Sequence, residues 1–193
     1  LVSINELPIG ALGSKVTSRL GHLERVESWV EGALSSPLGS GSGQFDNFTG
    51  TVKTAVPAFC LHSRAAIELV GGWDTDFITS QDSDLSMRMI DAGFLLFKTD
   101  LVEVSMTKRK SLGSWAKMGF RYGFWRTKIV LKHPKRLRLR EYLPWFGLIL
   151  TSILLMISSP FWFVPATLYG VTLILESIRL ALLKRRLSLL FGL

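Results

Sequence analysis

A carboxylate suited to proton transfer lies at the predicted start of a helix. Asp82 follows Gln81 and stands eight residues after the segment 71–74, which contains two glycines and a tryptophan. Backbone N–H groups at a helix start stabilise an anion by about 0.3–1 kcal/mol, so we expect Asp82 to be ionised and oriented. Such a carboxylate suits a general base that takes a proton from a hydroxyl group. Spacing alone also allows Gln81, Asp82 and Asp84 to act only as caps of the helix.

The residues after Asp82 predict an amphipathic helix over 82–92. Arg88 lies four residues after Asp84, a spacing that permits an ion pair on one helix face, and Gly93 is a natural C-terminal stop. The apolar residues on the other face are Leu85, Met89 and Ile90.

Strand and helix patterns alternate through the first 106 residues, which predicts a mixed α/β domain. Apolar residues at helical spacing predict an amphipathic helix over 15–34, and a Ser/Gly/Pro-rich loop follows over 35–43. A strand is predicted over 51–61, where Pro57 suggests an edge or a bulge. The remaining predicted elements are a helix over 63–70, capped by Ser63 and ended by Gly71 and Gly72, and short strands over 94–97 and 101–106.

Cys60 is the only cysteine, so an internal disulfide and a cysteine-cluster metal site are excluded. It lies in the apolar run 56–61, where we expect a small buried hydrophobe rather than a nucleophile. The three histidines form no ligand set in the sequence, and each is expected to be structural or exposed: His22, His62 and His133. The chain starts with leucine and its first residues are typical of a domain interior, so we expect it to be a fragment.

The chain divides into an acidic first part and a strongly basic second part. Residues 1–106 carry a net charge of −6 and residues 107–193 a net charge of +14, which together give +8. Twelve Lys and Arg residues and no acidic residue lie between 107 and 140. A basic block directly before apolar segments is typical of cytoplasmic juxtamembrane sequence, where cations attract anionic headgroups. We therefore expect membrane lipids, not nucleic acid, to be the partner of this block; no nucleic-acid-binding motif is found.

A second amphipathic helix is predicted over 114–131, inside the basic block. A helix with a basic face and neighbouring Trp and Tyr suits the headgroup region of a membrane. The alternative is a surface helix that packs on the core of the domain. The apolar or aromatic positions at a spacing of three to four are Trp115, Met118, Tyr122, Trp125 and Ile129.

Two apolar segments, over 143–158 and 161–175, predict membrane helices. Each is shorter than the roughly 20 residues that span a bilayer core, but flanking residues bring both near that length. Basic residues at both outer ends predict a transmembrane hairpin with both ends in the cytoplasm. The alternative is one span plus a re-entrant or interfacial piece. Glu176, the one acid in the second segment, could extend to the membrane surface, pair with Arg179 one turn on, or belong to a tunnel.

From about residue 28 to residue 150 the chain resembles the second half of a family-2 glycosyltransferase of the inverting, GT-A type. It is similar in particular to the succinoglycan-biosynthesis-like membrane glycosyltransferases of bacteria. Each motif alone is weak, but their order and spacing over about 120 residues are specific. The matching segments are 35–39, 71–74, 81–85 with Arg88 and 92–94, 109–112, 120–125, 132–134, and Leu143 with Pro144.

The resemblance implies roles for individual residues. The Glu-Asp pair of the family falls on Gln81 and Asp82, which makes Asp82 the candidate catalytic base. It would deprotonate an acceptor hydroxyl that attacks the anomeric carbon of a nucleotide sugar with inversion, and Trp73 would stack on a sugar face. The implied substrate- or acceptor-binding residues are Gly72, Trp73, Asp74, Gln81, Asp84 and Arg88. Those implied to bind diphosphate or acceptor at the membrane interface are Arg109, Arg121 and Tyr122.

The chain departs from the processive synthases that share this fold. Their Gln-x-x-Arg-Trp motif reads 118–122 here, with Arg121 and an aromatic but no glutamine, which puts processive polymerisation in doubt. Asp-x-Asp occurs at 74–76 and 82–84, but both places match other motifs of the family. The true metal and nucleotide motif is expected upstream. We therefore assign no metal ligand, and expect the full-length enzyme to use Mg²⁺ or Mn²⁺ at the diphosphate.

These expectations give three parts: the acceptor half of a catalytic domain over 1–110, a basic interfacial segment over 111–140, and transmembrane helices over 141–193. The expected function is sugar transfer from a nucleotide-sugar donor to a lipid-linked or polysaccharide acceptor. The expected location is the inner membrane, multi-pass, with the catalytic domain in the cytoplasm, and the fragment alone is expected to be inactive. Two alternatives stay open, a non-catalytic membrane adaptor with a vestigial domain and a basic nucleic-acid binder.

Overall fold

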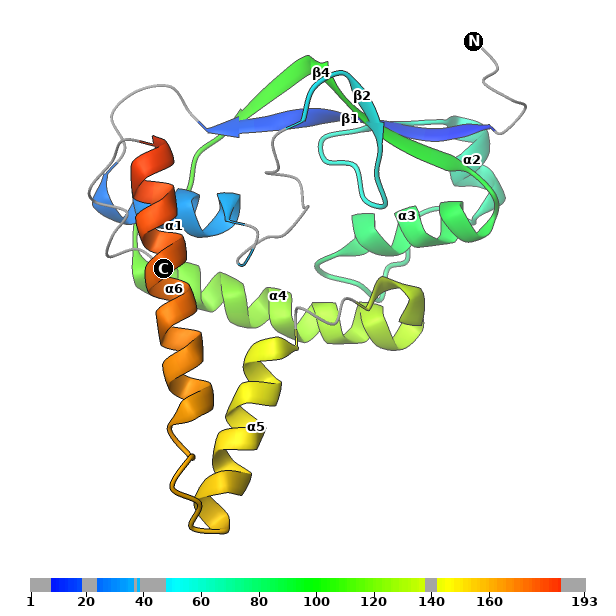
Figure 1. The fold of residues 1–193 in the computed structure, drawn as a ribbon. Helices are drawn as coiled ribbons and strands as arrows, with labels where there is room; N and C mark the ends of the chain where they lie inside the picture. The colour runs from blue at the N-terminus through cyan, green and yellow to red at the C-terminus, as the bar shows by residue number, and fades with distance from the viewer. Residues whose placement is uncertain (1–7, 19–23, 37, 39–47, 138–141, 185–193) are drawn as a thin grey trace.

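A computed structural model of the chain describes residues 8–18, 24–36, 38, 48–137 and 142–184 (Figure 1). His22, most of the loop over 35–43 and the basic residues at 138, 140, 185 and 186 lie outside these ranges. In chain order the elements are β1 (Ile9–Ser18), α1 (Arg25–Ser35), β2 (Thr51–Lys53), β3 (Leu61–His62), α2 (Arg64–Leu69), α3 (Gln81–Asp91), β4 (Leu95–Met106), α4 (Leu112–Lys132), the 3₁₀ turn η1 (Pro134–Arg136), α5 (Leu143–Met156) and α6 (Val164–Lys184).

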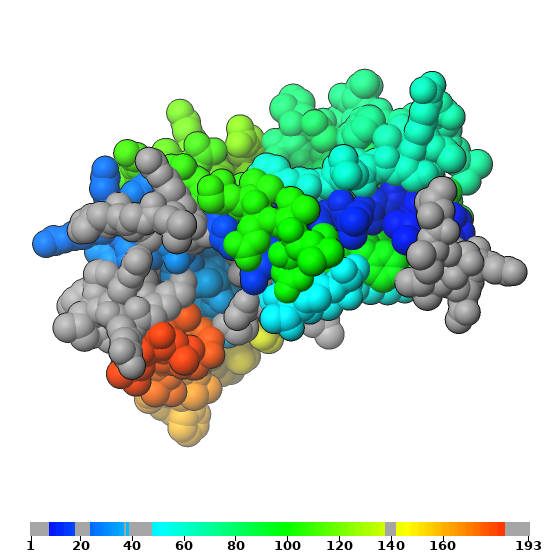
Figure 2. All heavy atoms as spheres, turned by 90° about the horizontal axis from the view of Figure 1, so that it is seen from above, coloured from blue at the N-terminus to red at the C-terminus, as the bar shows by residue number. Residues whose placement is uncertain are grey.

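The sheet contains both parallel and antiparallel strand pairs, which fits the predicted mixed α/β domain. Its strand order is β2-β4-β1-β3. The two long central strands, β1 and β4, run parallel, whereas β2 and β3 pair antiparallel at the two edges. Figure 1 shows the helices on one side of the sheet, with α4 running beneath and α5 and α6 extending away from it. In the view from above, β1, β2 and β4 come to the front, so the described residues cover only one face of the sheet (Figure 2).

The main core lies between the sheet and the pair α2 and α3. Apolar side chains with little or no exposure fill it: Ala11, Ala66, Leu85, Met89, Phe94 and Leu96. Ser63 caps α2 by accepting a hydrogen bond from the backbone N–H of Ala66, and α3 ends before Gly93, which has a φ of 91°. These two helices and α4 confirm the predicted helices over 63–70, 82–92 and 114–131 within one or two residues.

The predicted helix over 15–34 is wrong in its first part. Residues up to Ser18 belong to β1, and α1 begins only at Arg25. The reason is long-range pairing, because Lys15 and Val16 lie opposite Glu103 and Val104 of β4. Lys15 also forms an ion pair of 3.5 Å with Glu103. A local spacing of apolar residues cannot reveal this competition between helix and sheet.

The predicted strands differ from the observed ones in continuity. The single predicted strand over 51–61 is two short strands, β2 and β3, separated by an irregular segment around the buried Pro57. The two predicted strands over 94–97 and 101–106 are one strand, β4. Its pairing with β1 shifts register between Ser14 and Lys15, at the point where the sequence suggested a break.

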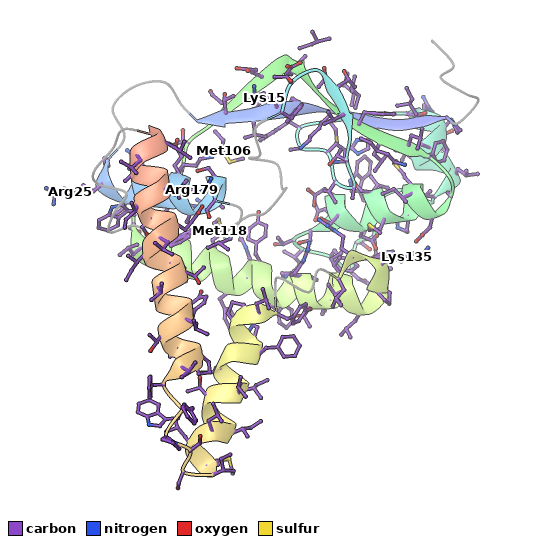
Figure 3. All side chains as sticks on the ribbon, in the orientation of Figure 1. Lys15, Arg25, Met106, Met118, Lys135 and Arg179 are labelled. Carbon is purple, nitrogen blue, oxygen red and sulfur yellow. The ribbon has the colours of Figure 1, made fainter. Side chains whose placement is uncertain are left out.

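The two apolar helices α5 and α6 pack against each other. Together they extend away from the sheet (Figure 1). Among the described residues, one helix, Val164–Leu183, is long and apolar enough to cross a membrane. The other, α5, has 14 residues, which corresponds to about 21 Å of helix. Within α6, Arg179 lies beside α1 (Figure 3). It donates two hydrogen bonds of 2.7 Å to Glu176, which is the paired alternative among those left open for this acid.

The irregular segment before β3 approaches β1 closely at Gly13, and a substitution there can test this contact. A Cβ added there would lie 2.6 Å from Cβ of Pro57 and 2.9 Å from the carbonyl oxygen of Ala58. Because backbone cannot yield easily, we expect Gly13→Ala to lower the free energy of unfolding by about 1–3 kcal/mol. Thermal unfolding in detergent measures the change.

Gly119 is the matched control for this substitution. It lies inside α4 with nothing within 4 Å of an added Cβ. Gly119→Ala should therefore raise stability by about 0.5–1 kcal/mol through helix propensity. Equal effects of the two substitutions would contradict the close approach at Gly13.

Candidate functional site

The N-terminus of α3 presents Asp82 to solvent. Ser80 is the N-cap, with a φ of 69° and no side-chain capping bond, and its carbonyl oxygen accepts a hydrogen bond from the N–H of Asp84. Asp82 is exposed, and its Oδ1 accepts a 2.8 Å hydrogen bond from the N–H of Ser83. Gln81 beside it is exposed as well. The first turn of α3 therefore holds a carboxylate that faces outward.

His62 lies near this carboxylate, whose charge acts on its imidazole, and Trp73 contacts His62. Their rings meet edge to face at 5.7 Å, and the indole of Trp73 is 49% exposed. Cys60, half-buried beside the core, has its Sγ 3.3 Å from Nε2 of His62. Partial burial lowers the pKa of His62, and the negative charge of Asp82 opposes this shift. Burial, and to a smaller extent the same charge, raises the pKa of the Cys60 thiol, so no reactive thiolate is favoured.

His62 is the neighbour of Trp73 that sequence reasoning missed. It lies on β3, the short edge strand, eleven residues before Trp73. No spacing rule connects these positions, because the contact arises from the turn after α2. The only sequence signal was a polar residue directly after an apolar run.

Asp84, two residues after Asp82, is fully buried and faces the opposite way. Arg88 donates a 2.8 Å hydrogen bond to its Oδ2, as the spacing of four predicted. Lys132 Nζ and His133 Nε2 each lie 2.8 Å from its Oδ1. Burial alone would raise the pKa of Asp84, but the hydrogen bonds from Lys132, His133 and Arg88 outweigh it and hold the pKa below its ordinary value. Asp84 is thus a buried anion enclosed by three donors rather than a helix cap.

Arg88 connects Asp84 to the glycine turn that precedes the loop of Trp73. Its guanidinium also donates to the carbonyl oxygens of Val70 and, at 2.7 Å, Gly72. Both Gly71 and Gly72 have positive φ, 78° and 74°, which other residues rarely adopt. The two glycines therefore turn the chain so that its carbonyl groups meet Arg88.

Lys132 joins Asp84 to Asp74. Its ammonium donates a 2.7 Å hydrogen bond to Oδ2 of Asp74, whose Oδ1 accepts from the N–H of Asp76. The hydrogen bond from Lys132 lowers the pKa of Asp74. Burial opposes the charge of Lys132, but hydrogen bonds to the two carboxylates raise its pKa above the ordinary value. The ammonium also lies 5.1 Å from the ring centre of Phe77.

An apolar cluster lies beside the ion pair of Lys132 with Asp74 and also joins the loop to α4. Phe77, Trp125 and Ile129 form a second buried cluster between the loop and α4, with the two rings 5.7 Å apart. In η1, directly after α4, Lys135 lies below α3 (Figure 3) and reaches Asp91 of that helix at 2.9 Å. The end of α4 is thus fixed to α3 and to the loop of Trp73.

The rest of α4 is largely exposed. Arg109, before the helix, and Arg121 and Tyr122 within it are all exposed. Arg121 lies eleven residues before Lys132, or about 16 Å along the helix. The structure therefore brings Gly72, Asp74, Asp84 and Arg88 together, but does not bring these three interfacial candidates into that cluster. Large exposed apolar side chains accompany the cations of α4: Phe120, Phe124 and Leu131.

No group of three or more His, Cys, Asp or Glu side chains within the described ranges is placed to hold a metal ion. In the two Asp-x-Asp segments, oxygens of Asp74 and Asp84 are bound to Lys132 instead. An ammonium at this place disfavours a divalent cation through charge repulsion. The residues that the structure describes therefore do not fit the Mg²⁺ or Mn²⁺ expected for a full-length enzyme.

Comparisons with known proteins find relatives among curated bacterial proteins. No protein-family model and no solved structure matches the chain. It is 28% identical over 153 aligned residues to the pre-mycofactocin glycosyltransferase of Mycobacterium tuberculosis, a match covering 66% of this chain and 33% of that protein. It is 31% identical over 118 residues to the succinoglycan biosynthesis protein ExoA of Rhizobium meliloti, covering 58% and 34%. The chain thus spans about a third of these relatives, and the similarities support a relationship to glycosyltransferases.

The enclosed carboxylate of Asp84 should govern stability in acid. Asp84→Ala leaves Lys132, Arg88 and His133 without their shared acceptor. We expect a loss of about 3 kcal/mol at neutral pH, the lower end for breaking a buried ion pair, because Arg88 and Lys132 keep some access to water.

The sign of the pH dependence follows from the lowered pKa of Asp84 and Asp74. Their contribution is present above about pH 4 and is lost as the pH falls further. The Tm difference between the wild type and Asp84→Ala should therefore shrink below about pH 4. A difference that is constant from neutral pH to strong acid would show that the Asp84 charge does not stabilise the fold.

Proposed function

We propose that the protein is a membrane-associated inverting glycosyltransferase of GT-A type in which Asp82 is the general base. It would move a sugar from a nucleotide-sugar donor to a lipid-linked or polysaccharide acceptor at the cytoplasmic membrane face. The observation that carries the proposal is an exposed carboxylate at the start of α3, near His62 and its ring partner Trp73, in a chain similar to a glycosyltransferase and to a succinoglycan biosynthesis protein.

In the proposed reaction Asp82 takes the proton of an acceptor hydroxyl. The oxygen forms a bond to the anomeric carbon of the donor sugar while the bond to the diphosphate breaks. The nucleoside diphosphate leaves with the bonding electrons, and the configuration at the anomeric carbon inverts. An exposed carboxylate at the start of α3 can be reached by the acceptor hydroxyl whose proton it would take.

The environments of the two carboxylates favour Asp82 over Asp84 as the base. Asp84 is completely enclosed, and its two oxygens are already hydrogen-bonded to Arg88, Lys132 and His133. A substrate could reach it only by breaking that set. Asp82 is exposed, and the half-exposed indole of Trp73 offers a flat apolar surface for a sugar ring.

The membrane part of the proposal rests on apolar surface and charge. The side chains of α5 and of the turn before α6 are mostly exposed and apolar, including Trp145, Phe146, Phe161 and Trp162. Contiguous apolar surface of this extent marks an interaction site, and a lipid bilayer suits two packed apolar helices. The exposed cations of α4, among them Lys117, Arg121 and Lys128, would then face the anionic cytoplasmic leaflet.

Asp82→Asn in the full-length protein tests the base. Asparagine keeps the size of the side chain but cannot accept the proton, so we expect sugar transfer to fall by about 10²-fold or more. Because Asp82 is exposed, the Tm should stay within about 2 °C of the wild type. Transfer of radiolabelled sugar from a nucleotide sugar to a membrane lipid fraction measures the change.

Asp76→Asn is the matched control, since Asp76 is an exposed carboxylate of the same region. This variant should keep most of the wild-type transfer rate. Full turnover by Asp82→Asn would refute the assignment of the base, and absence of transfer by the wild type with any nucleotide sugar would refute the proposed function.

The single cysteine makes the proposed topology simple to test. In a Cys60→Ala background, Ser159→Cys places a thiol in the turn between α5 and α6, and Thr107→Cys places one before α4. If both apolar helices span the membrane, an impermeant maleimide labels position 159 from outside intact spheroplasts. It labels position 107 only after permeabilisation. Labelling of both positions from the same side would rule out the hairpin.

A further inference from the structure

Lys132 and His133 occupy a place that the proposed chemistry does not explain. They form the last residue and the C-cap of α4, and neither contacts Asp82 in the described structure. Both converge on Oδ1 of Asp84, which lies 49 residues before His133 in the chain. Two donors from one helix end on a single buried oxygen form a specific joint between α4 and α3.

The loop that carries Trp73 is held by the same ammonium. Lys132 binds Asp74, the residue directly after Trp73, at 2.7 Å. Asp74 in turn organises the loop, because its side chain accepts from the N–H of Asp76 and its carbonyl oxygen accepts from the N–H of Phe77. Phe77 then packs under the ammonium and against Trp125. The described contacts of the loop therefore include ionic, hydrogen-bonded and apolar ones to the end of α4.

His133 contributes the second contact between the end of α4 and α3. Its side chain is 8% exposed, and its backbone N–H donates a 2.7 Å hydrogen bond to the carbonyl oxygen of Ile129. The imidazole lies between Asp84, at 2.8 Å, and Asp91, at 3.9 Å. His133 thus binds Asp84 on the side of Asp91, whereas Lys132 binds both Asp84 and Asp74.

We propose that Lys132 is a positioning residue that sets the distance between the Trp73 loop and the start of α3. By binding Asp74 and Asp84 together, its ammonium fixes the loop to the helix that presents Asp82. That Lys132 positions the Trp73 loop against α3 does not depend on any reaction. The effect of this positioning on acceptor binding rests on the proposed function. In that case Lys132 determines whether a sugar ring on Trp73 can bring a hydroxyl to Asp82.

Hydrogen exchange of the full-length protein in lipid nanodiscs tests the placement without any activity. Lys132→Met keeps the length and apolar contacts of the side chain but removes the charge. We expect exchange of the 72–80 amides to become faster by about tenfold or more, with exchange of β1 and β4 unchanged.

Lys128→Met is the matched control. Lys128 lies one turn earlier on α4, where its ammonium is 4.6 Å from the ring centre of Trp125. Its removal should leave exchange of 72–80 at the wild-type rate, and Lys132→Arg should restore most of the protection. Unchanged exchange of 72–80 in Lys132→Met would overturn the proposal. An equal increase across β1, β4 and the loop would overturn it too, because that result indicates general destabilisation.

A kinetic measurement tests the consequence for acceptor binding. Lys132→Met should raise the KM for the acceptor by about tenfold while kcat changes less than about threefold. A fall in kcat with an unchanged KM would overturn the role in acceptor placement. If the wild type transfers no sugar, the proposed function fails, but the exchange measurement still decides whether Lys132 holds the loop.

Discussion

The fully buried carboxylate of Asp84 is the interaction on which the rest of the site depends. An ionised carboxylate without exposure is tolerated only when its oxygens are well hydrogen-bonded, because desolvation costs several kcal/mol. Here the donors come from α3 itself and from the end of α4. Arg88 extends the set to the carbonyl groups before the loop of Trp73, and Lys132 extends it to Asp74. Satisfying one anion thus fixes the glycine turn, the loop, α3 and α4 relative to one another.

This constraint explains how two acidic residues on one helix turn differ in role. Successive residues of an α-helix are rotated by about 100°, so Asp82 and Asp84 point to nearly opposite sides. Asp84 faces the protein and is bound by structural donors, whereas Asp82 faces outward near His62, which in turn contacts Trp73. In the proposed function the buried carboxylate of Asp84 fixes the loop, α3 and α4 relative to one another, and the exposed carboxylate of Asp82 accepts the proton. The same joint connects the site to α4, the helix expected at the membrane surface.

Local rules predicted the local parts of this arrangement. The Arg88–Asp84 pair follows from a spacing of four, and the Ser63 cap and the Gly93 stop follow from residue type. The strand β1 was not predicted, because it depends on pairing with β4 more than 80 residues later. The contacts of Lys132 and His133 with Asp84 do not follow from local rules either, although the segment 132–134 is part of the resemblance. Their partners are distant in sequence, and no periodicity connects a helix end to a helix start 48 residues earlier.

The most direct test is an experimental structure of the full-length protein with a nucleotide diphosphate and an acceptor analogue bound. The acceptor hydroxyl should lie within about 2.6–3.2 Å of the Asp82 carboxylate, with the sugar ring against Trp73 and Asp84 still enclosed by Arg88, Lys132 and His133. An acceptor bound elsewhere, with Asp82 facing bulk solvent, would contradict the proposed site. So would an Asp84 that has left its three donors to contact the substrate.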